Sequence, residues 1–125
     1  MKCPRPLTDE ERRLVRWMIE HGDVAPEKFL RQLEAAIVVS ECECGCASIN
    51  FQIGDTKPDY KEGLKIICDC EYGPEEIPFG AFVFTRDDML AGLEVYSFTD
   101  EPAPLPAPED LRTFDGKKPE SSPRD

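Results

Sequence analysis

The stretch between residues 79 and 98 decides how this chain folds, because it joins two strand signals through a turn. It reads Phe79-Gly80-Ala81-Phe82-Val83-Phe84-Thr85, then Arg86-Asp87-Asp88, and then, after Met89, Leu90-Ala91-Gly92-Leu93-Glu94-Val95-Tyr96-Ser97-Phe98. The first segment is apolar on both faces, which is typical of a central strand with neighbours on both sides. Adjacent aspartates are typical of a solvated turn. The stretch therefore predicts two antiparallel strands joined by a short turn.

Two further strands are predicted before this hairpin. Ile49, Phe51 and Ile53 alternate with polar residues, as in a half-buried strand. Residues 54–63 contain glycines, a proline and charges, and we expect a loop there. In the next strand one face should carry Leu64, Ile66, Cys68 and Cys70, and the other Lys65, Ile67, Asp69 and Glu71. Because the connections are short, consecutive strands should pair antiparallel as a meander.

In the first third of the chain the apolar residues recur at helical spacing instead of alternating. Thr8 and Glu11 have the spacing of a capping box, in which each side chain accepts a backbone N–H of the other residue. Gly22 is expected to end the first helix in a left-handed conformation, and Pro26 suits the first turn of a second helix. The apolar stripes of the two helices are Leu14, Val15, Met18 and Ile19, and Phe29, Leu30, Leu33 and Ile37. Ile37-Val38-Val39 is also β-branched and could begin a short strand.

The end of the chain changes composition. Pro102, Pro104, Pro106 and Pro108 alternate with other residues, which favours extended geometry along the domain, with Leu105 and Leu111 as anchors. Residues 112–125 are expected to be a disordered tail. The sequence thus predicts one α+β domain over residues 1–111. Two N-terminal helices pack on an antiparallel meander sheet of about four strands, and a proline-rich C-terminal segment follows.

Composition and charge narrow the classes of function. The chain has 125 residues, with 26 acidic and 15 basic side chains and a formal net charge of −11. Residues 1–40 carry seven charges of each sign, so the negative charge belongs to the later residues. This argues against binding nucleic acid or an anionic membrane, and it favours a basic protein partner. No apolar stretch resembling a secretory signal follows the start, so we expect a cytoplasmic protein with reduced thiols.

Five of the six cysteines form two groups. Cys42, Cys44 and Cys46 lie within five residues, and Cys68 and Cys70 lie on a predicted strand. In one interpretation the strand cysteines are buried as small apolar residues and the first group is a tight turn. In the second, Cys42, Cys44 and Cys46 bind a structural zinc, with Cys68 or Cys70 as a further ligand and Gly45 bending the chain. In the third, the first group is a redox switch.

Sequence resemblances add expectations about family. Cys42-Glu43-Cys44-Gly45 is similar to the start of the SEC-C metal-binding motif, although Cys46 replaces its serine and its closing pair is missing. The chain more broadly resembles a group of small bacterial proteins of unknown function. The shared segments are Arg5-Pro6-Leu7-Thr8, Cys42-Glu43-Cys44-Gly45-Cys46-Ala47-Ser48 and Leu93-Glu94-Val95-Tyr96-Ser97. Its last strand and proline-bearing segment also look like those of small immunity-type proteins, and this resemblance implies a protein that masks a toxin.

No catalytic motif emerges from the sequence. His21 lies near the predicted end of the first helix, where a positive side chain complements the helix dipole. Nothing in the sequence places His21 beside a cysteine as a nucleophile pair. Glu94 and Tyr96 lie on the face opposite Leu93 and Val95, where they are candidate contact residues or second-face packing residues. We therefore expect a non-enzymatic binding protein, with a small zinc domain as the alternative and no cofactor assigned.

Overall fold

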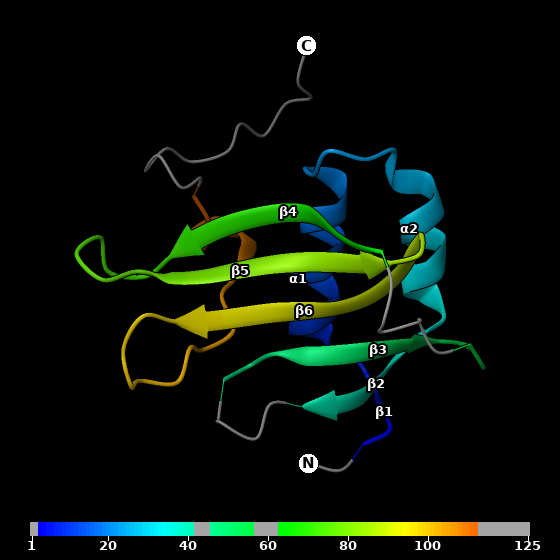
Figure 1. The fold of residues 1–125 in the computed structure, drawn as a ribbon, viewed down its shortest axis with the longest axis horizontal. Helices are drawn as coiled ribbons and strands as arrows, with labels where there is room; N and C mark the ends of the chain where they lie inside the picture. Colours follow the sequence, from blue (N-terminus) through cyan, green and yellow to red (C-terminus); the bar gives the residue numbers. More distant parts are fainter. Residues whose placement is uncertain (1–2, 42–45, 57–62, 113–125) are drawn as a thin grey trace.

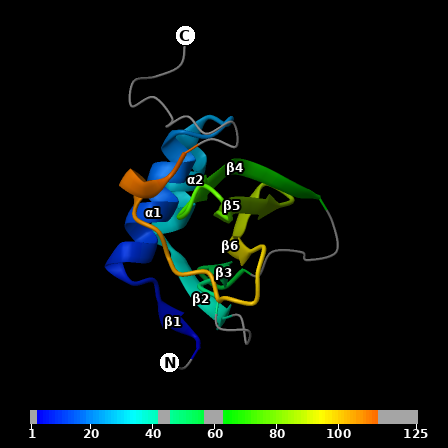
Figure 2. The ribbon, with the colours of Figure 1, turned by 90° about the vertical axis from the view of Figure 1, so that its left-hand side faces the viewer.

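The computed structural model describes residues 3–41, 46–56 and 63–112 (Figure 1). Within these residues six strands form one antiparallel sheet in the order β1-β2-β3-β6-β5-β4. The elements in chain order are β1 (Arg5–Pro6), α1 (Asp9–Glu20), α2 (Pro26–Glu34), β2 (Ala36–Glu41), β3 (Ile49–Ile53), β4 (Leu64–Tyr72), β5 (Phe79–Arg86), β6 (Met89–Ser97) and the 3-10 helix η1 (Pro108–Asp110). Both α-helices lie on the same side of the sheet (Figure 2).

The predicted α+β class is confirmed, but the predicted strand number and simple meander are wrong. The described sheet has six strands, because β1 and β2 add to the four predicted after residue 48. Ile37 belongs to β2 rather than to the second helix, which ends at Glu34. The strand β3 pairs with β6 through Ile49 and Leu93, so β4 lies at the far edge. Local spacing does not reveal this pairing, because the partners lie more than 40 residues apart.

The predicted β5–β6 hairpin is confirmed. Its turn consists of Asp87 and Asp88, with φ angles of 53° and 64°. Two successive positive φ angles are the signature of a type I′ turn, whose twist matches that of the flanking strands. The register shifts once between Phe84 and Thr85, and beyond this irregularity Phe82 faces Glu94 and Gly80 faces Tyr96.

The predicted faces of β4 are wrong in its first half. The register between β4 and β5 shifts between Ile66 and Cys68, so an extra residue is inserted into β4 there. Such a bulge reverses which residues point to the core. Ile67 is buried, whereas Leu64 and Ile66 are 49% and 41% exposed.

Gly22 allows α1 to approach this bulge closely. The N–H of the next residue, Asp23, donates to the carbonyl oxygen of Ile67 at 3.1 Å. A Cβ atom on Gly22 would lie 2.5 Å from Ile67 Cγ2 and 2.6 Å from the Ile67 oxygen. The helix ends here as predicted, but Gly22 does not adopt a positive φ, so its role is close packing.

The helices and the C-terminal segment cover one face of the sheet. The predicted capping box is present, with Thr8 Oγ1 accepting from the Glu11 N–H at 3.0 Å. The side chains buried on this face include Leu14, Met18, Ile19, Phe29, Leu33, Val38, Phe51, Val83, Leu93 and Val95. Of the predicted anchors, Leu111 is buried and Leu105 is partly buried against the core. Arg112 exchanges two backbone hydrogen bonds with Glu71 of β4, at 2.8 and 2.9 Å.

Except for Arg112, the expected disordered tail lies outside the described residues. Neither of the described α-helices has the length and apolar character needed to cross a bilayer.

The contact between α1 and β4 gives a test of this packing. We expect Gly22→Ala to lower the free energy of unfolding by about 1–3 kcal/mol, because the added methyl group overlaps Ile67 and must displace it. Urea denaturation measures this loss, and amide hydrogen exchange at Asp23 should accelerate with it. A variant with native stability and native protection of the Asp23 amide would contradict the close approach.

Candidate functional site

The face of the sheet opposite the helices carries an apolar surface formed by β4, β5 and β6. Residues Ala81, Val83, Leu93 and Val95 point to the helices and are at most 1% exposed. Their neighbours in each strand point the other way, away from the helices. In Figure 1 the helices lie behind the sheet, so this second face of the sheet is toward the viewer. We call this surface the open face and define it by Leu64, Ile66, Asp69, Glu71, Phe82, Phe84, Arg86, Glu94, Tyr96 and the following Phe98. None of the described helices covers it (Figure 2).

Four aromatic rings form a continuous strip on the open face. The ring centroids of Phe82 and Phe84 are 5.9 Å apart, and those of Phe82 and Tyr96 are 6.1 Å apart. Phe98 extends the strip, with its centroid 5.5 Å from that of Tyr96 in an edge-to-face arrangement. These separations are typical of favourable aromatic pairs. The strip therefore has a defined geometry before any partner arrives.

Two glycines allow the rings to lie close to the sheet. A Cβ atom on Gly80 would be 2.2 Å from Tyr96 Cζ, and one on Gly92 would be 2.8 Å from Phe84 Cζ. Each glycine faces its aromatic residue directly across the strand pair. Glycine in a strand interior commonly marks a close approach by another group, and here that group is an aromatic ring.

The strip is exposed at its Phe98 end, whereas Phe84 at its other end is only 7% exposed. Phe98 is 61% exposed, and Leu64 and Ile66 lie at the other end of the face. The Arg86 guanidinium lies over the Phe84 ring at 5.9 Å from its centroid. Its Nε atom is buried and has no hydrogen-bond partner among the described residues.

Three carboxylates, those of Asp69, Glu71 and Glu94, lie on the same face of the sheet as the rings. Burial raises the pKa of Glu94, with a hydrogen bond from Ser48 acting in the opposite direction, and burial also raises the pKa of Asp69. The pKa of Tyr96 is raised by burial and by the charges of Asp69 and Glu71. The Tyr96 hydroxyl therefore lies within the electrostatic reach of the β4 carboxylates. The open face is consequently both aromatic and acidic.

The structure places Glu94 and Tyr96 on the predicted face, opposite the buried Leu93 and Val95, and both are half-buried. Their role as contact residues stays a prediction. The sequence does not single out Phe82 and Phe84 as site residues. They belong to a segment that is apolar on both faces, which predicts a strand buried on both sides. The signal available was the alternation of Phe82, Phe84, Tyr96 and Phe98 at period two, together with glycines in the same strands.

The cysteines do not form a metal site within the described residues. Cys68 Sγ and Cys70 Sγ are 3.8 Å apart, close to the roughly 3.8 Å expected for two sulfurs on one zinc. The hydrogen bond between these thiols raises the pKa of Cys68 and lowers that of Cys70. Cys46 instead accepts a hydrogen bond from the Ala103 N–H at 3.3 Å, and no three metal-binding side chains converge in the described part of the chain. Cys42 and Cys44 lie outside the described residues, so the zinc and redox interpretations stay predictions.

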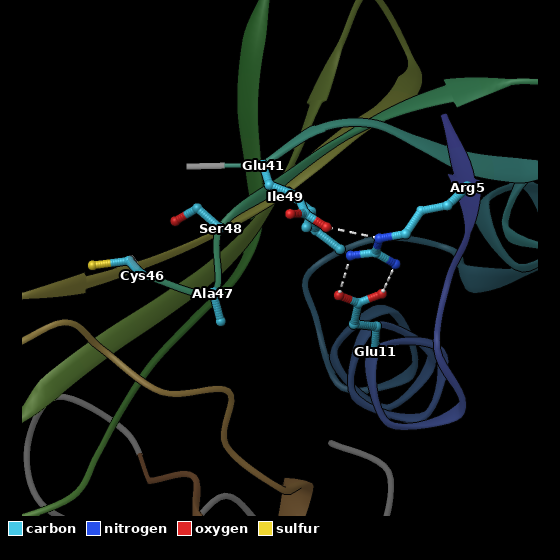
Figure 3. Close-up of a pocket in the computed structure, with 7 residues that line it drawn as sticks. All are labelled: Arg5, Glu11, Glu41, Cys46, Ala47, Ser48 and Ile49. Carbon is cyan, nitrogen blue, oxygen red and sulfur yellow. Dashed lines mark hydrogen bonds and ion pairs between the residues drawn. The ribbon is translucent and has the colours of Figure 1, made fainter. Parts of the chain in front are cut away.

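Two cavities on the covered side contain charges that are already paired. The first, of about 290 Å³, contains Arg5, which donates to Glu11 at 2.8 and 2.9 Å and to Glu41 at 2.8 Å (Figure 3). Cys46 points away from this cluster. Burial raises the pKa of Glu11, but hydrogen bonds from Arg5 and Thr8 outweigh burial and hold it below its usual value. This network joins β1, α1 and β2, so its charges have a structural role.

The second cavity, of about 400 Å³, lies between the C-terminal segment and the end of the β4–β5 hairpin. Its lining includes Tyr72, whose hydroxyl donates to the Pro104 carbonyl, and Glu109, which pairs with Arg13. Arg112 pairs with Glu71 and donates to the Gly73 carbonyl at 2.9 Å. The charged groups here hold the C-terminal segment in place.

His21 lies at the end of α1, as predicted. Its Nδ1 donates to the Trp17 carbonyl oxygen at 2.8 Å, and its ring stacks on Trp17 with centroids 4.1 Å apart. These contacts satisfy a carbonyl in the last turn of the helix.

Comparison with known proteins found no matching family model, no matching curated protein and no matching solved structure.

The burial of Glu94 predicts an unusual dependence of stability on pH. A carboxyl whose pKa is higher in the folded state than in the unfolded state loses folding stability as pH rises through the interval between the two values. Glu94→Gln removes this ionisation. We therefore expect the variant to gain stability relative to the native protein as pH rises from about 3 to 7. Chemical denaturation across this range measures the difference.

The control is Glu75→Gln, because Glu75 lies on the exposed β4–β5 turn and its substitution removes the same charge. A pH-dependent gain of equal size in both variants would show that overall charge is responsible rather than the burial of Glu94.

Proposed function

We propose that this chain is a non-enzymatic binding protein whose open face docks a basic protein partner. The observation that carries the proposal is the strip of four aromatic rings, which no described helix covers and whose exposed end is Phe98. Contiguous exposed apolar surface on a soluble domain commonly marks an interaction site, and aromatic residues are enriched in such sites. An immunity-type protein that masks a basic toxin is one concrete form of this function.

Charge supports a basic partner. The chain has a net charge of −11. The open face carries Asp69 and Glu94 without ion-pair partners among the described residues, beside Arg86 and the Glu71–Arg112 pair. Complementary charge accelerates association and disfavours wrong partners, while apolar contacts at the centre supply most of the affinity. An acidic aromatic surface therefore fits a partner with basic side chains around an apolar centre.

The test uses substitutions of exposed residues, which leave the fold intact. Ile66→Thr combined with Phe98→Ser removes apolar groups from both ends of the open face. Ile77→Thr is the matched control, because Ile77 is 52% exposed but lies in the β4–β5 turn. Each protein is immobilised and used to capture proteins from a lysate of the source organism, and the captured partner is then purified for titration.

We expect the native protein and Ile77→Thr to bind the same basic protein, with affinity that falls as salt concentration rises. The open-face double variant should bind it at least about tenfold more weakly, since it removes two large apolar contacts and a loss of about 1.4 kcal/mol is tenfold in affinity. Equal binding by the double variant, or a partner that is acidic and bound independently of salt, would contradict the proposal.

A further inference from the structure

One row of the open face alternates acid, aromatic ring and acid across three strands. The β4–β5 register pairs Asp69 with Phe82, and the β5–β6 register pairs Phe82 with Glu94. Adjacent strands lie about 4.8 Å apart, so the two carboxylates flank the Phe82 ring from opposite sides. A group placed over this ring would meet negative charge on both sides.

These two carboxylates, of which Glu94 is half-buried and Asp69 is exposed, differ from the partly buried carboxylates that take part in ion pairs. Glu71, two residues from Asp69 on β4, pairs with Arg112 at 3.3 Å, and Glu11 and Glu41 share Arg5. No ion pair within residues 3–41, 46–56 and 63–112 involves Asp69 or Glu94. Burial beside the rings disfavours the charged form of Glu94, and the exposed Asp69 adds negative charge to the same row. The row is therefore complementary to a positive group from outside the described chain.

The arrangement of two carboxylates on either side of an aromatic ring favours a guanidinium group over a metal ion. The row supplies two carboxylates and an apolar ring, and no three metal-binding side chains converge among the described residues, so the row does not favour a metal ion. A guanidinium group is planar, stacks on aromatic rings and donates hydrogen bonds from several edges at once. The same face already holds one such contact, because the Arg86 guanidinium lies over Phe84. Phe82 lies two residues before Phe84 on the same face of β5. Among the described residues no cation lies over the Phe82 ring.

We propose that Asp69, Phe82 and Glu94 form a guanidinium site that receives an arginine side chain of the partner. This inference rests on the proposed docking function and specifies its central contact. The guanidinium stacks on the Phe82 ring and donates to Asp69 on one side and Glu94 on the other. Tyr96, which contacts Phe82, extends the aromatic surface beneath the side chain. An ammonium group has no plane to stack and satisfies this geometry less well.

The test uses N-acetyl-arginine amide and N-acetyl-lysine amide as probes at constant ionic strength. Each is titrated into the full-length protein while the ring resonances of Phe82 and Tyr96 are followed by NMR. We expect weak binding, millimolar or weaker, with larger shifts at Phe82 for the arginine probe than for the lysine probe. Asp69→Asn and Glu94→Gln should each weaken arginine binding about two- to fivefold, as for other solvent-accessible charge pairs.

Two further variants separate the ring from the overall charge. Phe82→Leu keeps an apolar residue and should abolish the preference for arginine over lysine, whereas Glu75→Gln should bind both probes as the native protein does. Equal shifts from the two probes, or arginine binding unaffected by both carboxylate substitutions, would overturn the guanidinium site. If partner capture still depends on Ile66 and Phe98 in that case, the docking face remains supported and only the arginine assignment is wrong.

Discussion

The register of β5 with its two neighbours is the constraint on which the rest of the structure depends. Each residue of β5 faces one residue of β4 and one of β6, so its alternation decides both faces of the sheet at once. A slip of one residue would turn Phe82 into the core and expose Ala81. The type I′ turn at Asp87 and Asp88, together with the register shift between Phe84 and Thr85, sets the pairing of β5 with β6. Packing against the helices holds Ala81 and Val83 of β5 in the core.

The same constraint explains which features could be predicted from the sequence. The capping box at Thr8, the start of the second helix at Pro26 and the β5–β6 turn depend on residues close together in the chain, and all were predicted. The β3–β6 pairing and the bulge at Ile67 depend on distant partners, which local spacing cannot reveal. The bulge matters most for the site, because it moves Leu64 and Ile66 from the predicted inner face to the open face.

Several polar groups on the open face lack either an ion-pair partner or a hydrogen-bond partner among the described residues. On the covered side Arg5 pairs with Glu11 and Glu41, and on the open face Glu71 pairs with Arg112. On the open face Asp69 and Glu94 have no ion-pair partner, and the Arg86 Nε has no acceptor, among the described residues. Local departures of this kind commonly mark a functional site in an otherwise consistent fold. The sequence predicted two of its residues, Glu94 and Tyr96, but could not show that three strands combine their side chains into one surface.

The central claim is that the partner covers the open face rather than the helices. The most direct measurement is the relaxation of aromatic ring protons by a soluble paramagnetic agent, before and after the complex forms. The account predicts that relaxation at Phe82, Tyr96 and Phe98 falls on binding, while relaxation at Trp17 of α1 is unchanged. Rings of the open face that stay equally accessible in the complex, with protection at Trp17 instead, would contradict it.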